Sequence, residues 1–148
     1  MKFMLDDGNI LQVQPEILMF PDSEDDWDRN WISTKISIKA GSFIGDYNAE
    51  FMTIDFEIFK RELMKLYNDL NGNATLKCLE GYLTIKIKGD GIGHFEANCI
   101  AIDNPGINEN KLEFSVSFDQ TQIPELVAQL NAITREFPLI GEFNLDLN

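Results

Sequence analysis

The stretch Ile32-Ser-Thr-Lys-Ile-Ser-Ile-Lys-Ala40 decides the fold class, because apolar and polar residues alternate along it with a period of two. Such alternation indicates a strand with one buried and one polar face. The same period recurs in Leu83-Thr-Ile-Lys-Ile87 and Leu112-Glu-Phe-Ser-Val-Ser-Phe118. Clusters of turn-forming residues separate these stretches, namely Ala40-Gly-Ser42, Lys88-Gly-Asp-Gly91 and Asp103-Asn-Pro-Gly106. Such turns predict antiparallel hairpins rather than helical crossovers.

Two other segments carry apolar residues at spacings of three and four, which predicts amphipathic helices. The first begins near Thr53, which can cap it, and is stopped by Asn71-Gly-Asn73. The second begins near Thr121, tolerates Pro124 in its first turn and ends before Pro138. Each helix has a single apolar stripe, so both helices must bury that stripe against a sheet.

The order of these elements repeats along the chain, because residues 9–72 and 73–138 each read as strand, strand, strand, helix. We therefore predict an α+β fold in which an antiparallel sheet carries both helices on one face. A strongly bent sheet or half-barrel is the variant of this architecture. Residues 1–148 are expected to form a single domain, and the alternating tail 139–148 could add an edge strand.

Composition favours an ordered, soluble protein, with 44% hydrophobic residues and eleven Phe for a packed core. The apolar runs fall short of the roughly 20 residues that span a bilayer, and the first residues lack the charged and apolar regions of a signal peptide. Cys78 and Cys99 lie in apolar, strand-like stretches and fit reduced core thiols better than a disulfide framework. We expect a cytoplasmic protein that does not bind membranes.

The chain is strongly acidic, with a formal net charge of −13. Such a charge opposes the approach of nucleic acid and favours a basic partner, although it can also serve solubility alone. The acidity is concentrated in residues 1–30, where two bases, Lys2 and Arg29, stand against eight carboxylates: Asp6, Asp7, Glu16, Asp22, Glu24, Asp25, Asp26 and Asp28.

The segment Asp22-Ser-Glu-Asp-Asp-Trp-Asp28 is similar to the opening of a calcium-binding loop, because carboxylates occupy alternate positions. The glycine expected at the sixth position of such a loop is Trp27, and the bidentate acid expected at the twelfth is Ser33. We therefore expect no metal at this segment.

The glycine-rich segment Lys88-Gly-Asp-Gly-Ile-Gly-His94 fits neither of the standard nucleotide fingerprints, and a strand rather than a helix follows it. A hairpin turn is the better interpretation. His94, the only histidine, has no metal-ligand spacing and no catalytic partner nearby in sequence. His94 and the surplus of carboxylates are the whole basis for an enzyme, so we expect no catalytic residues and no cofactor.

Two tryptophans flank the end of the acidic segment. Trp31 stands two and four residues before Ser33 and Lys35, so it lies on the same side of the strand as they do. Its indole is therefore expected on the polar side. Tryptophan is enriched at binding hot spots, and carboxylates steer a basic partner. The alternative is a tryptophan covered by the acidic loop or by the tail. The predicted partner-binding residues are Asp22, Glu24, Asp25, Asp26, Trp27, Asp28 and Trp31.

In the order and spacing of several segments the chain resembles the WapI-type immunity family of bacterial contact-dependent toxin systems. The resemblance covers residues 15–137 and leaves out the tail after Pro138. Its segments are Asp26-Trp-Asp-Arg-Asn-Trp31 with the strand after it, the hairpin 41–51 that leads into the first helix, Leu79-Glu-Gly81, Lys88-Gly-Asp-Gly-Ile-Gly-His94, and Phe118-Asp-Gln-Thr-Gln-Ile-Pro-Glu-Leu126.

The resemblance implies a stoichiometric, non-enzymatic inhibitor that binds the toxic carboxy-terminal domain of a secreted protein and protects the cell that makes it. A nuclease is the implied target, and the family carries no active site. The alternative is a module that holds a small apolar ligand or lipid between a curved sheet and its helices. An apolar pocket on the order of several hundred Å³ beneath the helices would support that alternative, and a solid core would count against it. The oligomeric state stays open.

Overall fold

The computed structural model describes residues 1–4 and 9–145, and within these ranges each half of the chain forms its own antiparallel sheet and ends in a helix. The first sheet has the order β1-β2-β3-β4, with strands Lys2–Met4, Ile10–Leu18, Trp31–Ala40 and Phe43–Met52. The second has the order β5-β6-β7-β8, with strands Asn71–Lys77, Leu83–Asp90, His94–Ile102 and Lys111–Asp119. Helix α1 (Thr53–Asp69) follows β4, and helix α2 (Ile123–Glu136) follows β8.

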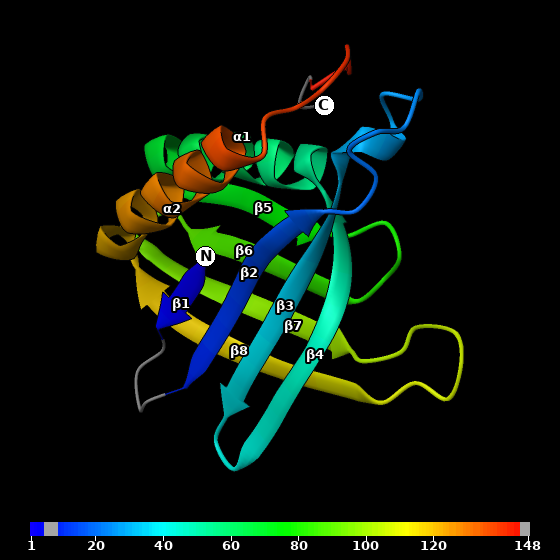
Figure 1. Cartoon of the computed structure of the whole chain (residues 1–148). Coiled ribbons are helices and arrows are strands. Elements are labelled where there is room, and N and C mark those ends of the chain that lie inside the picture. Colours follow the sequence, from blue (N-terminus) through cyan, green and yellow to red (C-terminus); the bar gives the residue numbers. More distant parts are fainter. Residues whose placement is uncertain (5–8, 146–148) are drawn as a thin grey trace.

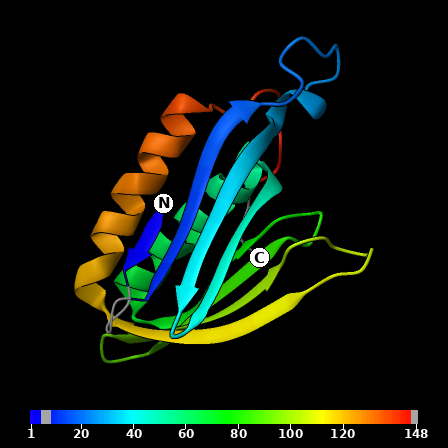
Figure 2. The ribbon, with the colours of Figure 1, turned by 60° about the horizontal axis from the view of Figure 1, so that its bottom comes forward.

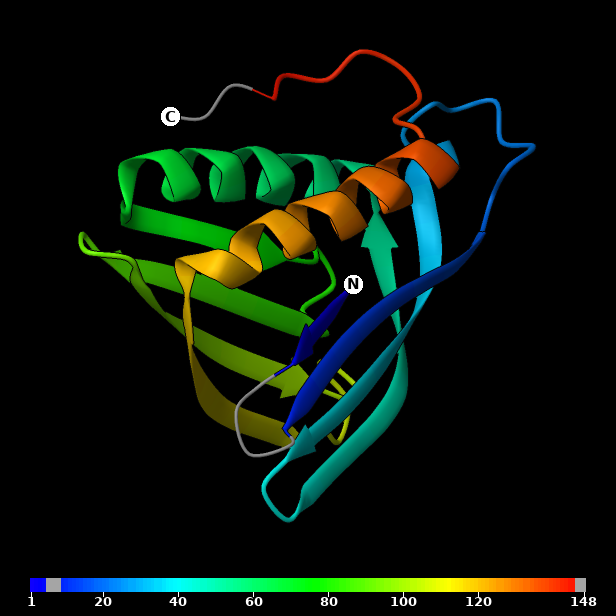
Figure 3. The same cartoon turned by 90° about the vertical axis from the view of Figure 1, so that its left-hand side faces the viewer.

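The two sheets face each other, and their strands cross at a steep angle (Figures 1 and 2). Both helices lie side by side over the end where the sheets diverge (Figure 3). Helix α1 packs along β5 and against α2, where the Lys60 ammonium donates a hydrogen bond of 3.0 Å to the Thr134 hydroxyl. The helices therefore close the space between the two sheets.

A single hydrophobic cluster joins both halves. The apolar side of each alternating strand points into it, as Ile36 of β3 and Ile85 of β6 show with no exposed surface. The helix stripes point into the same cluster, and Phe59 and Leu63 of α1 are likewise fully buried. The predicted α+β class, the antiparallel pairing and the two similar strand-and-helix halves are confirmed.

The structure adds one strand to each half and divides the strands between two sheets. Strand β1 has only three residues, too few for a readable alternation. Strand β5 begins at Asn71-Gly-Asn73, a sequence typical of a turn, because pairing with β6 in the register Asn71↔Asp90 overrides a weak strand propensity. The turn itself is made one residue earlier by Leu70, which adopts a left-handed conformation with φ +57°.

The prediction that Thr53 and Thr121 cap the two helices is wrong. Met52 occupies the N-cap position of α1, and its N–H donates a hydrogen bond of 2.8 Å to the Asp55 carboxylate. Thr53 is already helical, and its buried hydroxyl has no hydrogen-bond partner among the described residues. Before α2, a 3-10 turn over Gln120–Gln122 is capped by Asp119, whose carboxylate accepts the Thr121 N–H at 2.8 Å.

The tail offers no support for an edge strand. Residues 139–145 are irregular, and residues 146–148 lie outside the described part of the chain. Gly141 has φ +90°, and Ile140 hydrogen-bonds to a side chain rather than to a strand. No helix within the described ranges is long and apolar enough to cross a bilayer.

Candidate partner-binding site

The predicted partner-binding residues lie in and beside the connection between β2 and β3, residues 19–30, called here the acidic connection. The connection projects beyond the end of the sheet at the upper right of Figure 1. At its base the Met19 N–H donates a hydrogen bond of 2.9 Å to the Trp31 carbonyl. The connection therefore leaves and re-enters the sheet at one backbone pair.

Local hydrogen bonds order the acidic connection. The Trp27 N–H donates a hydrogen bond of 2.9 Å to the Asp25 carboxylate, and the Arg29 N–H donates one of 3.3 Å to the Asp25 carbonyl. A short 3-10 turn over Asp28–Asn30 leads into β3. Arg29 also pairs with Asp26 at 3.3 Å, but this pair is exposed and contributes little to stability. Most of the negative charge of the connection is therefore left facing solvent.

Most of the residues predicted to bind the partner are exposed. Asp22, Glu24, Asp25, Asp26 and Trp27 are exposed, while Asp28 and Trp31 are half-buried. The structure thus brings the acids and Trp27 together on one connection, with Trp31 at its base.

The two tryptophans have different surroundings. Trp31 lies on the outer face of β3 together with Ser33 and Lys35, as its parity predicts. Trp27 is 42% exposed, and its ring lies 5.7 Å from the ring of Phe143 in the tail, at an angle of 52°. The tail therefore covers part of Trp27, while Trp31, for which the sequence left such cover open, is half-buried.

Asn30 fastens the acidic connection to the tail and was not singled out by the sequence. Its side chain is fully buried, and its amide N–H groups donate to the Asp26 carbonyl at 2.7 Å and to the Ile140 carbonyl at 2.9 Å. Its amide oxygen accepts the Ile140 N–H at 2.8 Å. An asparagine near a turn is too common a pattern to predict contacts across 110 residues.

A hollow of about 330 Å³ opens on the acidic connection. Met19, Phe20 and Pro21 form its apolar wall, and Asp22 and Asp28 add carboxylates. A long basic side chain combines an apolar stem with a charged head, so the hollow has the chemistry to receive one.

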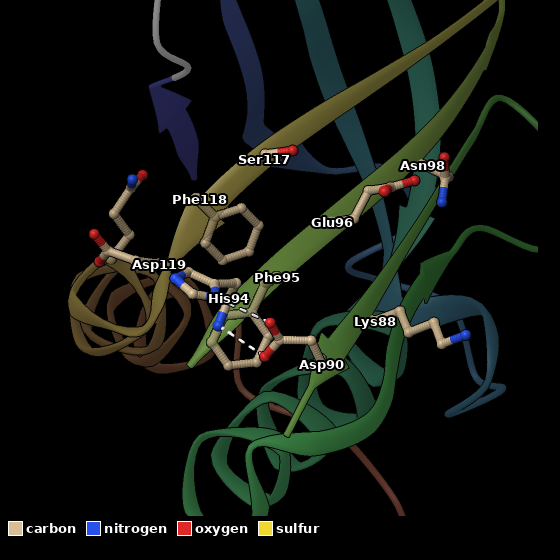
Figure 4. A pocket seen from close by; sticks show the side chains of 11 residues that line it. Lys88, Asp90, His94, Phe95, Glu96, Asn98, Ser117, Phe118 and Asp119 are labelled. Atoms are coloured by element: carbon tan, nitrogen blue, oxygen red, sulfur yellow. Dashed lines mark hydrogen bonds and ion pairs between the residues drawn. The ribbon is translucent and has the colours of Figure 1, made fainter. Parts of the chain in front are cut away.

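A larger groove of about 820 Å³ lies over β6, β7 and β8 around His94 (Figure 4). The His94 Nδ1 is 2.9 Å from the Asp90 carboxylate, whose other oxygen accepts the N–H groups of Ile92 at 2.8 Å and His94 at 3.1 Å. These hydrogen bonds, that of Ile92 foremost, lower the pKa of Asp90. Strand alternation predicts the polar face but not the groove.

Among the described residues that line the groove, no nucleophile is paired with a base. His94 is 71% exposed, and no hydroxyl or thiol of these residues hydrogen-bonds to it. The two cysteines are free and buried, as predicted, and burial raises the pKa of Cys99 to about 12. The described residues also contain no group of three His, Cys, Asp or Glu side chains placed to hold a metal ion.

A third cavity, of about 440 Å³, lies between the β3–β4 hairpin and the facing ends of β7 and β8. Phe43, Tyr47 and Leu112 contribute its apolar lining. It is at the opposite end of the strands from the helices, whose inward side chains are packed into the core.

Together these features describe an α+β protein whose distinctive surface is an ordered, acidic and partly aromatic connection. The sequence matches the immunity protein WapI-like family over residues 2–138. The chain belongs to this family, and membership indicates a role in toxin immunity.

Two solved structures align with most of this chain. The Trypanosoma bruciei MRP1/MRP2 structure has a TM-score of 0.46 and 10% identity, over 93% of this chain and 84% of that chain. The plant transcriptional regulator PBF-2 has a TM-score of 0.45 and 11% identity, over 93% of this chain and 81% of that chain. No curated protein matches the sequence.

Proposed function

We propose that this chain neutralises a cognate toxin domain by stoichiometric, non-catalytic binding, and that the acidic connection is its contact surface. Family membership supports the immunity role. One observation carries the choice of surface: the connection holds exposed carboxylates around the partly exposed Trp27, held in place by its own hydrogen bonds. A preorganised surface loses less freedom on binding than a flexible one.

The charge of the chain favours a basic toxin, and we propose a nuclease. A nuclease cleft that holds phosphates is basic, so an acidic protein with a net charge of −13 would be drawn to it. Long-range attraction of this kind raises the association rate and depends on salt. The protein would act in the bacterial cytoplasm, where it protects the cell that makes the toxin.

The hollow beside Phe20 gives this proposal a specific contact. An arginine or lysine of the toxin could lay its aliphatic stem on Phe20, which is 48% exposed, and place its charge between Asp22 and Asp28. The competing class, a lipid-binding module, is less favoured. The inward faces of both helices are packed into the core. The cavity at the far end of the strands is lined by Asp46, Asp103 and Lys111 as well as by apolar side chains.

We expect the gene immediately upstream to encode the toxin as the carboxy-terminal domain of a secreted protein, and the test is binding to that domain. Titration calorimetry should give one immunity protein per toxin domain, with loss of the toxin's activity. Reversal of Asp22, Glu24, Asp25 and Asp26 to Lys should weaken binding by about a hundredfold or more and flatten its salt dependence.

A matched control reverses Asp69, Glu80, Glu96 and Glu136, which are exposed and lie outside the acidic connection. Equal losses for the two sets would show that net charge alone matters and remove the connection as the site. Absence of any binding by the unmodified chain would overturn the immunity function for that toxin.

A further inference from the structure

We infer that residues 139–145 form the second half of the partner-binding surface, so that the acidic connection and this tail act as one composite surface for a basic protein. The inference rests on the proposed function and extends it to a segment beyond the family match, which ends at residue 138. In Figure 3 the tail leaves α2 beside the connection and then runs over α1.

The first argument is the way the two segments are fastened. Asn30 is fully buried and uses both sides of its amide, donating to the Asp26 and Ile140 carbonyls and accepting from the Ile140 N–H. Separating the tail from the connection would leave these buried polar groups unpaired, which is unfavourable. The tail therefore stays attached when a partner approaches.

The second argument is the close approach of the tail backbone to the acids. A Cβ atom placed on Gly141 would lie 3.0 Å from the Asp26 Cβ and 3.1 Å from its carboxylate. Gly141 also has φ +90°, a conformation that favours glycine. A partner that binds Asp26 therefore meets the tail backbone at the same place.

The third argument is the aromatic contact. The rings of Trp27 and Phe143 pack at a tilt with centroids 5.7 Å apart, and both side chains keep part of their surface exposed. The two rings form one partly exposed apolar patch, on a connection that also carries exposed carboxylates. A patch of this composition is typical of the centre of a protein interface.

The charge of the composite surface indicates what kind of partner binds it. Residues 19–30 and 139–145 hold six carboxylates and one base, Arg29, which is already paired with Asp26. Glu142 in the tail is exposed and adds to the negative charge of the composite surface. The surface therefore fits a basic protein face with an apolar centre and repels nucleic acid.

The inference is tested with the full chain and the toxin domain encoded immediately upstream. Phe143→Ala removes the tail aromatic, and Glu142→Lys reverses its charge. We expect Phe143→Ala to weaken binding by about tenfold, mainly through faster dissociation. Glu142→Lys should slow association by several-fold at low salt.

The controls are Phe43→Ala and Glu80→Lys, which make the same changes at exposed positions outside the composite surface. Both controls should alter affinity by less than about twofold. Hydrogen exchange on the unmodified chain should show protection of residues 19–30 and 139–145 together when the toxin binds.

If both tail variants match their controls while charge reversal in the acidic connection still weakens binding, the composite surface is wrong and the proposed function stands. If the unmodified chain does not bind the toxin domain, the proposed function and this inference fail together. Glu142→Lys changes a solvent-facing side chain, so its result does not depend on whether Phe143→Ala folds normally.

Discussion

The second and third strands of the two halves are joined in very different ways. Between β6 and β7 the residues 91–93 suffice, with Gly91 at φ +89° and Gly93 at φ +102°. Between β2 and β3 the chain runs through residues 19–30, although its ends meet in the hydrogen bond from Met19 to Trp31. A tight turn would therefore suffice to join β2 and β3, and most of the added residues are exposed rather than packed in the core.

The two connections are also held by different parts of the molecule. The short turn is held by backbone hydrogen bonds to neighbouring segments. The Gly91 N–H donates a hydrogen bond of 2.8 Å to the Leu70 carbonyl, and the Gly93 carbonyl accepts one of 3.0 Å from the Gln120 N–H. The acidic connection is held at the surface by Asn30 and the tail. Changes to the short turn should act on stability, and changes to the exposed side chains of the acidic connection should act on binding.

The largest effect is expected when residues 20–30 are replaced by Asn-Gly, a two-residue hairpin turn. Binding to the toxin should fall by about a thousandfold or more, because the carboxylates and Trp27 are removed. The circular dichroism spectrum and cooperative unfolding should persist. Retained binding would place the site elsewhere, and loss of folding would contradict the comparison of the two connections.

The next effect concerns stability beside the short turn, at Gly89 near the end of β6. In Gly89→Ala the new Cβ would lie 2.4 Å from the Leu70 carbonyl oxygen and 3.0 Å from the Phe95 ring, so backbone must move. We expect the free energy of unfolding, measured with urea, to fall by about 3 kcal/mol. Gly45→Ala is the control, because its nearest neighbour is the Ile38 Cβ at 3.7 Å. Equal losses in the two variants would refute the steric account.

A smaller loss is expected for Asn30→Ala, which leaves the Asp26 and Ile140 backbone groups without their partner. The free energy of unfolding should fall by about 2 kcal/mol, and hydrogen exchange at Ile140 should accelerate. Asn98→Ala makes the same change on an exposed strand face and should alter stability by less than about 0.5 kcal/mol. Unchanged exchange at Ile140 would show that Asn30 does not hold the tail.

The last effect depends on pH and separates the starts of the two helices. Burial raises the pKa of Asp55 at α1 to about 6, above the ordinary value of 3.8, whereas hydrogen bonds from Thr121 lower the pKa of the exposed Asp119 before α2. The folded state thus holds a proton on Asp55 more tightly than the unfolded state. Asp55 therefore adds stability as the pH falls through about 6, by roughly 1–3 kcal/mol near pH 4.

Asp55→Asn should remove this gain, so the variant's free energy of unfolding should depend less favourably on acidification between about pH 7 and pH 4. Asp119→Asn should act in the opposite direction, because a lowered pKa stabilises the fold at higher pH and the contribution is lost on acidification. Urea titrations at several pH values compare the two. Identical pH profiles for both variants would contradict the difference between the helix starts.

Periodicity was enough to predict the fold class. The alternation around Ile36 and the helical spacing around Phe59 reflect burial on one face, and burial is what the structure shows at both residues. The number of sheets could not be predicted, because periodicity gives the face of a strand and not its neighbour. Strand β5 was missed for the same reason, since Asn71-Gly-Asn73 becomes a strand only through pairing with β6.

Only the charged and aromatic residues of the candidate site could be predicted from the sequence. The exposed acids and Trp27 were found because their types cluster in sequence. The contacts of Asn30 with Ile140 and of Trp27 with Phe143 join segments that are distant in the chain, and no local pattern signals them. The groove at His94 likewise depends on how three strands are placed side by side.

The hydrogen bond from Met19 to Trp31 has a practical consequence for protein engineering. Its two residues form a fixed stem from which inserted sequences of varied length can emerge without disturbing the β2–β3 ladder. Libraries of randomised peptides grafted between them would be displayed on a packed scaffold, and toxin-resistant cell growth would select the peptides that bind. New inhibitor specificities could then be obtained without redesign of the core.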